Sequence, residues 1–277
     1  MSNEWQDDLS RRFGDAPVPA GGESVPASWK ALAGHGSCRR FEPELLDDRL
    51  IATLCALALS SPSKSDLQQR DIVIVDDPEL RAAIDGLMVP DQPWIAGAPH
   101  LLVFLGNNRR QRQIHRMRGH IFANDHLDAF FNAAVDAGIA LSALVLAAEA
   151  AGLGTCPISG IRNHAAQVSR LLDLPDHVFP VAGLALGKPV RPPLVTPRLA
   201  LAQTVHRNRY NDAEQEKGID VYDRRRHELT PFRTQRDPNR FGTPDLYGWS
   251  EDKARQYADQ ERADFGQYVR DIGFRLD

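Results

Sequence analysis

GLGTCPISGIRN, residues 152–163, follows directly on residues 129–151, a stretch with almost no polar face. Apolar residues on nearly every side of such a stretch predict a helix that is buried over most of its surface. Three glycines and a proline then fall within nine residues, as at a helix end followed by a tight turn. Glycine also lets another group approach the backbone closely. The stretch therefore predicts a helix cap with a turn, a loop whose backbone lies against a flat ligand, or both.

Shorter elements surround this helix, and both kinds of secondary structure occur among them. Apolar runs predict strands within 71–78, 100–107 and 178–189, with one further extended segment at 199–210. Helical spacing predicts helices at 47–60, 78–88, 163–175 (with Asn163 as N-cap) and 249–274. The basic stretch 107–120 is typical of a solvated face or, alternatively, of a patch for a nucleotide phosphate, and 211–249 is typical of a long polar excursion. Strands interleaved with helices indicate a mixed protein but leave the sheet order open.

Composition excludes several classes of protein. The chain has 277 residues, 42% of them hydrophobic and 25% charged, which suits a soluble globular protein with a sizeable core. A net charge of −4 argues against nucleic acid or an anionic membrane as a partner. Three widely spaced cysteines predict a reducing compartment, the cytoplasm, rather than a disulfide framework. The first 26 residues lack the apolar segment of a secretory signal, and we expect them to form a flexible arm.

Common catalytic and metal motifs are not found in the sequence. No G-x-G-x-x-G follows a strand and no P-loop pattern occurs, which disfavours a Rossmann site or a P-loop NTPase. His115, His120 and His126 do not have the i, i+4 spacing of helical metal ligands, so we expect no bound metal. Serines 24, 37 and 159 lack the G-x-S-x-G setting of a hydrolase nucleophile.

Several weak motifs become specific when they are taken together. They are GHGSCRRF (34–41), SPSKSDLQ (61–68), GLGTCPISGIRN (152–163), LLDLPDHVFPVAGLALGKP (171–189) and TPRLA (196–200). In this order the chain resembles the nitroreductase and FMN reductase family, most of all its larger NADPH-dependent, oxygen-insensitive branch. The similarity extends from about Trp29 to Tyr210, with a weaker similarity in the C-terminal helix.

The resemblance implies an α+β fold in which a central, mostly antiparallel sheet is flanked by helices. It also implies an intertwined homodimer with FMN bound between the subunits. We expect an FMN-binding domain over 27–210 after the arm at 1–26. Residues 211–277 would then add an excursion and a C-terminal helix that pack on the same domain.

The resemblance also assigns the residues around the flavin, one position at a time. His35 and Arg198 would face the phosphate, and Arg39 would reach the N1/O2 edge of the ring. Ser63 and Ser65 would come from the partner chain, and Gln92 would contact the pyrimidine edge. A backbone N–H near Ser159 would point at the flavin N5. The full predicted set for FMN is His35, Gly36, Ser37, Arg39, Ser63, Lys64, Ser65, Gln92, Pro157, Ile158, Ser159, Gly160, Thr196 and Arg198, with Arg162 and Arg262 for NADPH.

Two positions depart from the family pattern, and both departures remove positive charge near the expected phosphate. Gly36 stands where the larger branch usually has a basic residue after the histidine. Thr196 stands where it usually has a lysine two positions before the arginine. Lys64, Lys188 and Arg191 are candidates for compensating cations.

The function implied by the resemblance is hydride transfer from NADPH or NADH to FMN, followed by reduction of a nitroaromatic, a quinone or a free flavin in a ping-pong cycle. No side chain need act as acid or base, because the cofactor carries the difficult chemistry. Two alternatives remain: a flavin reductase that supplies reduced FMN to another protein, and a non-catalytic FMN-binding protein.

Overall fold

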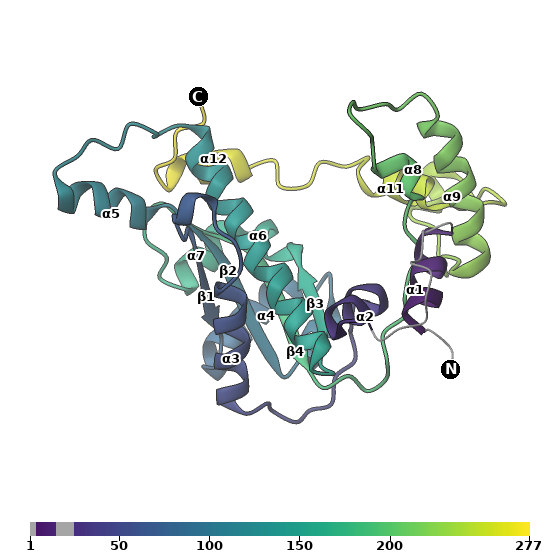
Figure 1. Ribbon diagram of the computed structural model, residues 1–277, viewed down its shortest axis with the longest axis horizontal. Helices are drawn as coiled ribbons and strands as arrows, with labels where there is room; N and C mark the ends of the chain where they lie inside the picture. The colour runs from purple at the N-terminus through teal and green to yellow at the C-terminus, as the bar shows by residue number, and fades with distance from the viewer. Residues whose placement is uncertain (1–3, 15–24) are drawn as a thin grey trace. The chain divides into compact units, whose positions relative to one another are not determined.

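The computed structural model describes residues 4–14 and 25–277, which fall into two compact units (Figure 1). The first unit comprises Met1–Gly36 with Leu194–Glu261, and the second comprises Ser37–Pro193 with Arg262–Asp277. The predicted arm at 1–26 is described only in part, because residues 1–3 and 15–24 lie outside the described residues. Within it, Glu4–Phe13 form a helix, α1, whose Trp5 and Arg12 are buried.

A four-stranded antiparallel sheet forms the centre of the second unit. Its strands are β1 (Arg70–Ile74), β2 (His100–Asn107), β3 (Gly154–Ile158) and β4 (Val178–Gly187). Their order across the sheet is β1-β2-β4-β3, so β1 and β3 are the two edges. Every neighbouring pair is antiparallel, with Ile72 opposite Phe104 and Cys156 opposite Ala185. The expected antiparallel sheet is thereby confirmed, and its order is now known.

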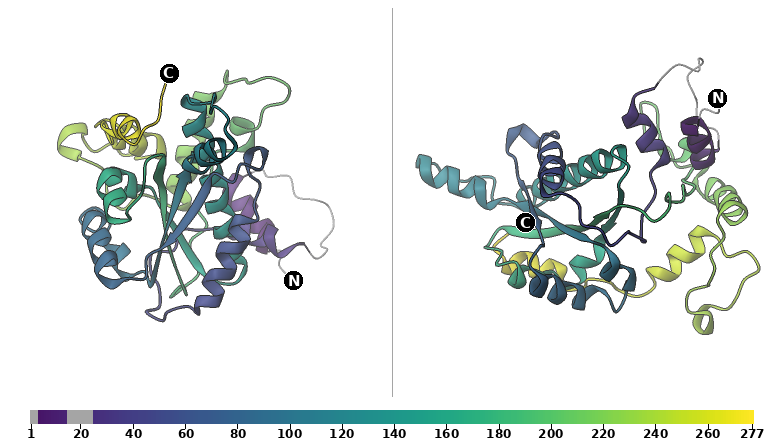
Figure 2. Two further views of the ribbon diagram at one scale, coloured as in Figure 1. Left: turned by 90° about the vertical axis from the view of Figure 1, so that its left-hand side faces the viewer. Right: turned by 90° about the horizontal axis from the view of Figure 1, so that it is seen from below.

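Helices cover both faces of this sheet (Figure 2). Successive side chains of a strand point to opposite faces, and β2 divides accordingly. Leu102 and Phe104 pack toward α3 (Asp48–Leu59) and α6 (Leu127–Ala150). Leu101 and Val103 belong to the core on the other face, with α4 (Pro78–Met88) and α7 (Ala165–Leu171). Because β2 is apolar on both sides, all eight of its residues are buried.

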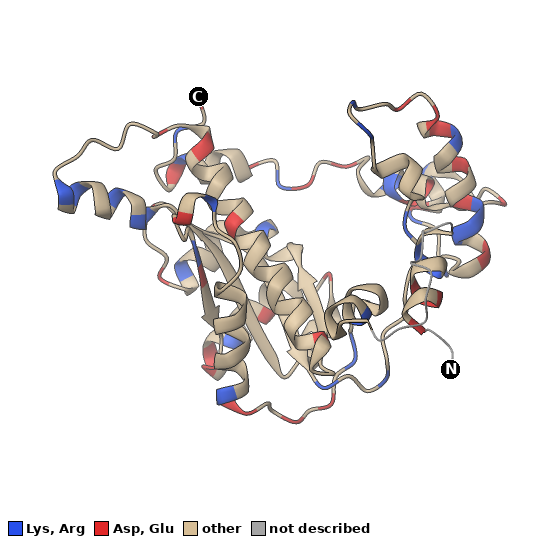
Figure 3. Ribbon diagram, viewed as in Figure 1, with Lys and Arg blue, Asp and Glu red and all other residues tan. Residues whose placement is uncertain are grey.

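The long helix α6 confirms the helix predicted over 129–151. It ends where Gly152 adopts a φ of +78° and Leu153 N–H bonds to Ala148 O at 2.9 Å, a glycine C-cap of the kind considered for this stretch. By length and composition α6 could cross a membrane, and Figure 3 shows it with few charged residues. One side of it packs on α3 and the sheet, but only 33% of its most apolar window is buried, so the predicted burial over most of its surface is not seen in the single chain. Its outer face still exposes Leu127, Phe131 and Val135.

The remaining elements of the second unit are short helices that connect strands or follow them. They are η1 (Lys64–Asp66), η2 (Pro93–Gly97), α5 (Arg109–Arg118), η3 (Ser159–His164) and α12 (Phe265–Asp271). The N-terminal part of α6, Phe179 of β4 and α12 share a third apolar cluster. The C-terminal segment docks within this unit through Tyr268 and Val269, with Phe265 and Ile272 packed against the same cluster.

The first unit consists of helices and irregular segments in the described part of the chain. The helices are α1, α2 (Ala27–Gly34), α8 (Leu201–Thr204), α9 (Gln215–Leu229), α10 (Pro238–Phe241) and α11 (Trp249–Gln256). Tyr222 of α9 packs edge-on against Trp249, with ring centroids 5.5 Å apart. The carboxylate of Asp223 accepts a hydrogen bond from Ser250 N–H at 3.0 Å. These contacts join α9 to α11.

Five expectations from the sequence are wrong in detail. The segment 199–210 contains a helical turn, α8, and no strand, and the excursion 211–249 contains the helix α9. The predicted helix 249–274 is two helices, α11 and α12. Part of the opening stretch forms an edge strand, β3, despite its glycine and proline. Asn163 is not an N-cap, because α7 begins at Ala165 and Asn163 bonds to Arg262 instead.

A buried histidine should make the stability of the second unit depend on pH. His100 is 6% exposed, its Nε2 accepts a hydrogen bond from Leu46 N–H at 2.8 Å, and burial lowers its pKa. Because the folded pKa lies below the unfolded one, the contribution of His100 is complete above the unfolded value near 6.5. It is lost as the pH falls through the folded pKa. We expect the free energy of unfolding to fall between pH 7.5 and pH 5 in denaturant titrations.

The variant His100→Gln isolates this effect. Its amide oxygen can accept the same bond but does not titrate. The wild type should therefore lose more stability on acidification than His100→Gln does. Equal losses in the two proteins would contradict the assignment.

Candidate functional site

The first predicted flavin segment lies beside the edge strand β3. Cys38 N–H donates to Thr155 O at 2.8 Å, so residues 37–39 run along the outer edge of the sheet. Arg39 and Ser37 both act to lower the pKa of the Cys156 thiol, against the larger effect of its burial, so both side chains lie near it. Burial raises the pKa of both Cys38 and Cys156, so these thiols are protonated at neutral pH and make poor nucleophiles. The edge thus presents polar groups and backbone rather than a reactive sulfur.

Three segments converge at the end of β3. The Arg39 guanidinium lies over the Trp94 ring, 5.7 Å from its centroid, which brings the first segment to the loop that carries Gln92. Gln92 reaches the turn after β3 so closely that a Cβ on Gly160 would lie 2.8 Å from its Nε2. Only glycine fits at residue 160 without displacing that amide. Ser37, Arg39, Gln92 and Gly160, all predicted flavin contacts, therefore occupy one neighbourhood.

This neighbourhood fits a flat, hydrogen-bonding ring. Along the predicted segment Pro157 and Ser159 are exposed, while Ile158 and Gly160 are buried. The exposed side of the segment thus presents a small side chain and backbone groups. Its other side is anchored in the core. Exposed Arg39 supplies a cation at the same place. Small residues, backbone groups and a nearby cation suit the pyrimidine edge of an isoalloxazine.

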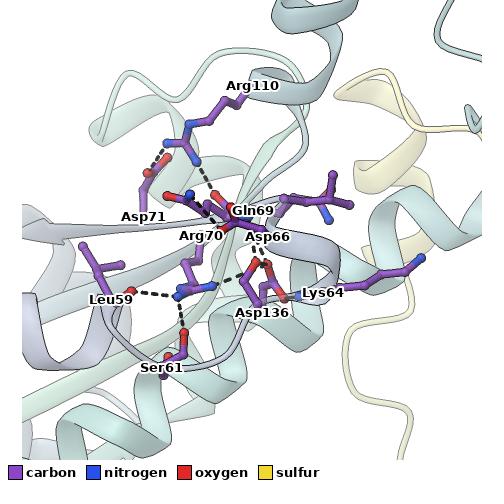
Figure 4. A network of polar contacts seen from close by, with 12 residues as sticks. Leu59, Ser61, Lys64, Asp66, Gln69, Arg70, Asp71, Arg110 and Asp136 are labelled. Carbon is purple, nitrogen blue, oxygen red and sulfur yellow. Dashed lines mark hydrogen bonds and ion pairs between the residues drawn. The ribbon is translucent and has the colours of Figure 1, made fainter.

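A second predicted segment, residues 63–69, is organised by one buried carboxylate (Figure 4). Asp136 of α6 is fully buried and accepts three hydrogen bonds from this loop. The donors are Ser63 Oγ at 2.7 Å, Lys64 N–H at 3.0 Å and Gln69 N–H at 3.0 Å. Hydrogen bonds to an ionised acceptor are among the stronger ones in proteins. Asp136 therefore fixes both ends of the loop.

The backbone of the loop is strained, and its side chains point either into the loop or outward. Ser65, Asp66 and Gln68 have φ values of 48°, 56° and 51°, in a region that residues other than glycine rarely adopt. Ser63 Oγ donates to Asp136 and accepts from Gln68 N–H at 2.7 Å, so this hydroxyl is engaged inside the loop. Lys64 and Ser65 are exposed, and Lys64 Nζ lies 3.2 Å from Asp128. Of the three predicted flavin contacts in this loop, the Ser63 hydroxyl is engaged inside the loop, and Lys64 and Ser65 face outward.

Arg70 balances the charge of Asp136. Its side chain is 3% exposed, and its Nη1 lies 3.7 Å from Asp136 Oδ2. Its Nη2 donates to Leu59 O at 2.8 Å and to Ser61 O at 2.7 Å, at the end of α3. The pair therefore joins α3, the loop, β1 and α6 at a single point.

The predicted phosphate contacts lie in the first unit, where Arg12 brings them together. The Arg12 guanidinium donates to His35 O at 2.6 Å and to Thr196 O at 3.4 Å. Arg198 N–H donates to Arg12 O at 2.6 Å, and Arg198 Nη1 bonds to Thr196 Oγ1 at 2.8 Å. Gly36 is buried directly after His35. His35, Thr196 and Arg198, which are far apart in the sequence, are therefore neighbours.

The two residues predicted for NADPH also approach one another. Arg262 Nε donates to Asn163 Oδ1 at 2.6 Å, next to Arg162 in the sequence. Arg162 donates to Val181 O and lines a hollow of about 290 Å³ with His164 and Arg170. Asp264 also lines the hollow, and the two arginines still outnumber this carboxylate, which suits a phosphate.

Sequence reasoning missed three residues of these clusters: Arg12, Trp94 and Asp136. Asp136 could have been noticed, because it is one of only three charged residues in the 24-residue helix α6. Arg12 gave no comparable signal, because it lies among other charged residues in a segment typical of an arm. Across residues 4–14 and 25–277, no group of three or more His, Cys, Asp or Glu side chains could hold a metal ion.

Comparison with known proteins identifies the fold and the family. The sequence profile of the nitroreductase family matches residues 32–188, and that of the nitroreductase family C-terminal domain matches residues 196–277. The chain belongs to the nitroreductase family. The resemblance inferred from the scattered motifs is thereby confirmed.

Individual relatives match between about two thirds and nine tenths of the chain. An FMN reductase (NAD(P)H) of Bacillus subtilis (strain 168) is 30% identical over 253 residues, which are 90% of this chain and 98% of the relative. An oxygen-insensitive NADPH nitroreductase of Salmonella typhimurium is 36% identical over 192 residues, covering 69% of this chain and 78% of the relative. The structure of B. megaterium NfrA2 superposes with a TM-score of 0.82 at 31% identity, covering 91% of this chain and all of that one.

Removing the charge of Asp136 should destabilise the second unit strongly. Asp136→Asn keeps the shape, but its amide cannot accept all three loop hydrogen bonds and leaves Arg70 as an uncompensated buried charge. Breaking a buried ion pair from one side costs about 3–5 kcal/mol. We expect a loss of that size in denaturant unfolding.

Asp125→Asn serves as the matched control, because Asp125 pairs with Arg112 in the same unit but does not contact the loop. It should cost clearly less than Asp136→Asn, because the Asp125 side chain remains 23% exposed and Asp136 has no exposed surface. Equal losses in the two variants would contradict a special role for Asp136.

Proposed function

We propose that this protein is an FMN-dependent NAD(P)H oxidoreductase of the nitroreductase type that reduces nitroaromatics, quinones or flavins. The observation that carries the proposal is the convergence of Ser37, Arg39, Gln92 and Gly160 at the end of β3. Two relatives matched over nearly their full length are named as FMN reductases, and a relative matched over 78% of its length is named as an NADPH nitroreductase, which supports the same activity.

The residues of the chain bind and orient the cofactor in this proposal. Bound FMN would supply the hydride-accepting and hydride-donating centre. Arg39 and Gln92 hold the pyrimidine edge through a cation and an amide. The backbone of Ile158–Gly160 would lie along the ring, and Gly160 leaves room for the Gln92 amide beside it. His35 and Arg198 hold the phosphate in the first unit, where Arg12 already joins their segments.

We further propose that the active form is a homodimer whose two chains share each flavin. The loop 63–69 leads into β1 and the segment 157–160 leaves β3, at opposite edges of the sheet. With neighbouring strands about 4.8 Å apart, the edges are separated by roughly 14 Å. This separation favours a ring that takes one set of contacts from each chain. The exposed apolar face of α6, with Leu127, Phe131 and Val135, supplies a surface for the partner.

NADPH is the preferred reductant in this proposal. Arg162, His164 and Arg170 surround one hollow, and Arg262 bonds to the adjacent Asn163. Such a basic cluster favours the 2′-phosphate that distinguishes NADPH from NADH. We place the enzyme in the cytoplasm, because its three cysteines are unpaired.

The test of the proposed function is an anaerobic absorbance spectrum of the purified protein after reconstitution with FMN. Addition of NADPH should bleach the flavin band, and a nitroarene or a quinone should restore it. A protein that binds FMN but is not bleached by NADPH or NADH would be a non-catalytic flavin-binding protein. The names of the FMN reductase relatives favour free FMN as a competing oxidant, so turnover with FMN and with a nitroarene should be compared.

Replacing Arg39 should lower the midpoint potential of the bound flavin. A cation at the N1/O2 edge favours the reduced, negatively charged flavin over the oxidised one. We expect Arg39→Ala to slow reduction by NADPH about tenfold or more, and to weaken FMN binding less than that. The potential is measured by anaerobic dye titration and the rate by stopped flow.

Arg40→Ala is the control, because Arg40 is the neighbouring exposed arginine and has no predicted flavin contact. Arg40→Ala should leave the midpoint potential and the rate of reduction by NADPH unchanged. A wild-type potential in Arg39→Ala would remove Arg39 from the proposed site.

A charge on the outer face of α6 should separate the subunits. Phe131 is 60% exposed in the single chain, and in a symmetric dimer Phe131→Glu would bury two carboxylates. We expect the dimer to weaken by about 100-fold or more, since each buried, unpaired polar group costs roughly 1–3 kcal/mol. Sedimentation velocity at micromolar concentration measures this. A wild-type protein that is monomeric while loaded with FMN would refute the shared site.

A further inference from the structure

Arg12 lies outside the part of the chain that the family profiles match, which begins at residue 32. It belongs to α1 in the first unit, and it is only 5% exposed. A guanidinium is rarely buried to this extent unless its charge and its donors are satisfied by specific groups. Its position therefore calls for an explanation that the common nitroreductase fold does not provide.

The Arg12 side chain clamps the turn that carries His35. Its Nη2 donates to Ala33 O at 2.8 Å and to His35 O at 2.6 Å, and its Nε donates to Ala33 O at 3.3 Å. His35 is the C-cap of α2, so its carbonyl belongs to the negative end of a helix. A planar guanidinium with several donors in a fixed fork suits a turn of this kind better than a single ammonium does.

The same residue also holds the segment that carries Arg198. Arg12 Nη1 lies 3.4 Å from Thr196 O, and the Arg12 carbonyl accepts Arg198 N–H at 2.6 Å. Arg12 thus holds this segment with both its side chain and its backbone carbonyl. Arg198 Nη1 is in turn held by Thr196 Oγ1 at 2.8 Å. Loss of Arg12 would leave the two segments without this connection.

Other contacts fix α1 in this position. Arg225 of α9 donates to Ser10 O at 3.2 Å and to Arg12 O at 3.3 Å, at the negative end of α1. Trp5 packs against Trp29 of α2, with ring centroids 6.1 Å apart. Arg12 is therefore held from both ends of its helix, and its guanidinium has a defined place.

The charge of Arg12 matters as well as its hydrogen bonds. The two neighbouring positions in this cluster, Gly36 and Thr196, contribute no charge. A phosphate monoester carries between one and two negative charges at neutral pH. Arg12 also interacts electrostatically with Asp8, one turn earlier in α1, so its charge is shared between that carboxyl and the site. A buried cation is screened less by salt than an exposed one.

We propose that Arg12 is a positioning residue for the phosphate of FMN, which locks His35 and Arg198 into one arrangement and adds positive charge beside them. The inference rests on the proposed function, in which these two residues face the phosphate. It assigns to the N-terminal helix of this chain a part in cofactor binding.

The experiment compares FMN with riboflavin, which has the same ring and lacks the phosphate. Apo-protein is titrated with each flavin for the wild type, Arg12→Met and Arg12→Lys. Arg12→Met keeps the apolar stem and removes the charge and the fork. We expect it to weaken FMN by about tenfold or more and riboflavin by less than about twofold. Arg12→Lys, which keeps the charge, should retain part of the preference for FMN.

Arg225→Met is the matched control, because Arg225 also ties α1 to the first unit but does not bond to His35 or Thr196. The ratio of the two dissociation constants should stay within about twofold of the wild type in this variant. An unchanged ratio in Arg12→Met, or an equal fall in Arg225→Met, would overturn the inference. A wild type without preference for FMN over riboflavin would instead overturn the proposed phosphate site.

Discussion

The second unit depends on a buried carboxylate in an otherwise apolar helix. Asp136 has no exposed surface, yet it accepts hydrogen bonds from both ends of the loop 63–69 and pairs with Arg70. An ionised group in such a place is stable only while its partners surround it. The strained backbone at Ser65, Asp66 and Gln68 is therefore maintained by Asp136, and strain of this kind is common at ligand-binding sites.

The order of the strands sets a second constraint. The loop 63–69 and the turn after β3 lie at opposite edges of one sheet, and each carries predicted flavin contacts. A single chain separates these groups, whereas in the proposed homodimer two chains packed through α6 would bring them together. The sheet topology thus links the two parts of the proposal, the bound FMN and the homodimer.

The sequence predicted those elements whose own residues determine them. Helix α6 and strands β2 and β4 have continuous apolar runs, and Asp47 marks the start of α3 as its N-cap. Strand β3 was missed because glycine and proline normally interrupt strands, whereas this one is an edge strand with β4 as its one neighbouring strand. Helix α9 is polar along most of its length and is stabilised by distant partners of Tyr222 and Asp223. Arg12 was missed for the same reason, since its partners are remote in sequence.

Two adjacent residues of helix α6 belong to two different surfaces, the exposed apolar face and the buried contact with the loop 63–69. Val135 is exposed on the outer apolar face, and Asp136, the next residue, holds the loop from the inside. In a dimer that shares its flavin, the association of the chains and the retention of the cofactor are therefore one linked equilibrium. By mass action, dilution alone should release FMN from such a protein, and added FMN should drive the chains back together. The share of flavin that stays with the protein through a sizing column would then report the state of assembly.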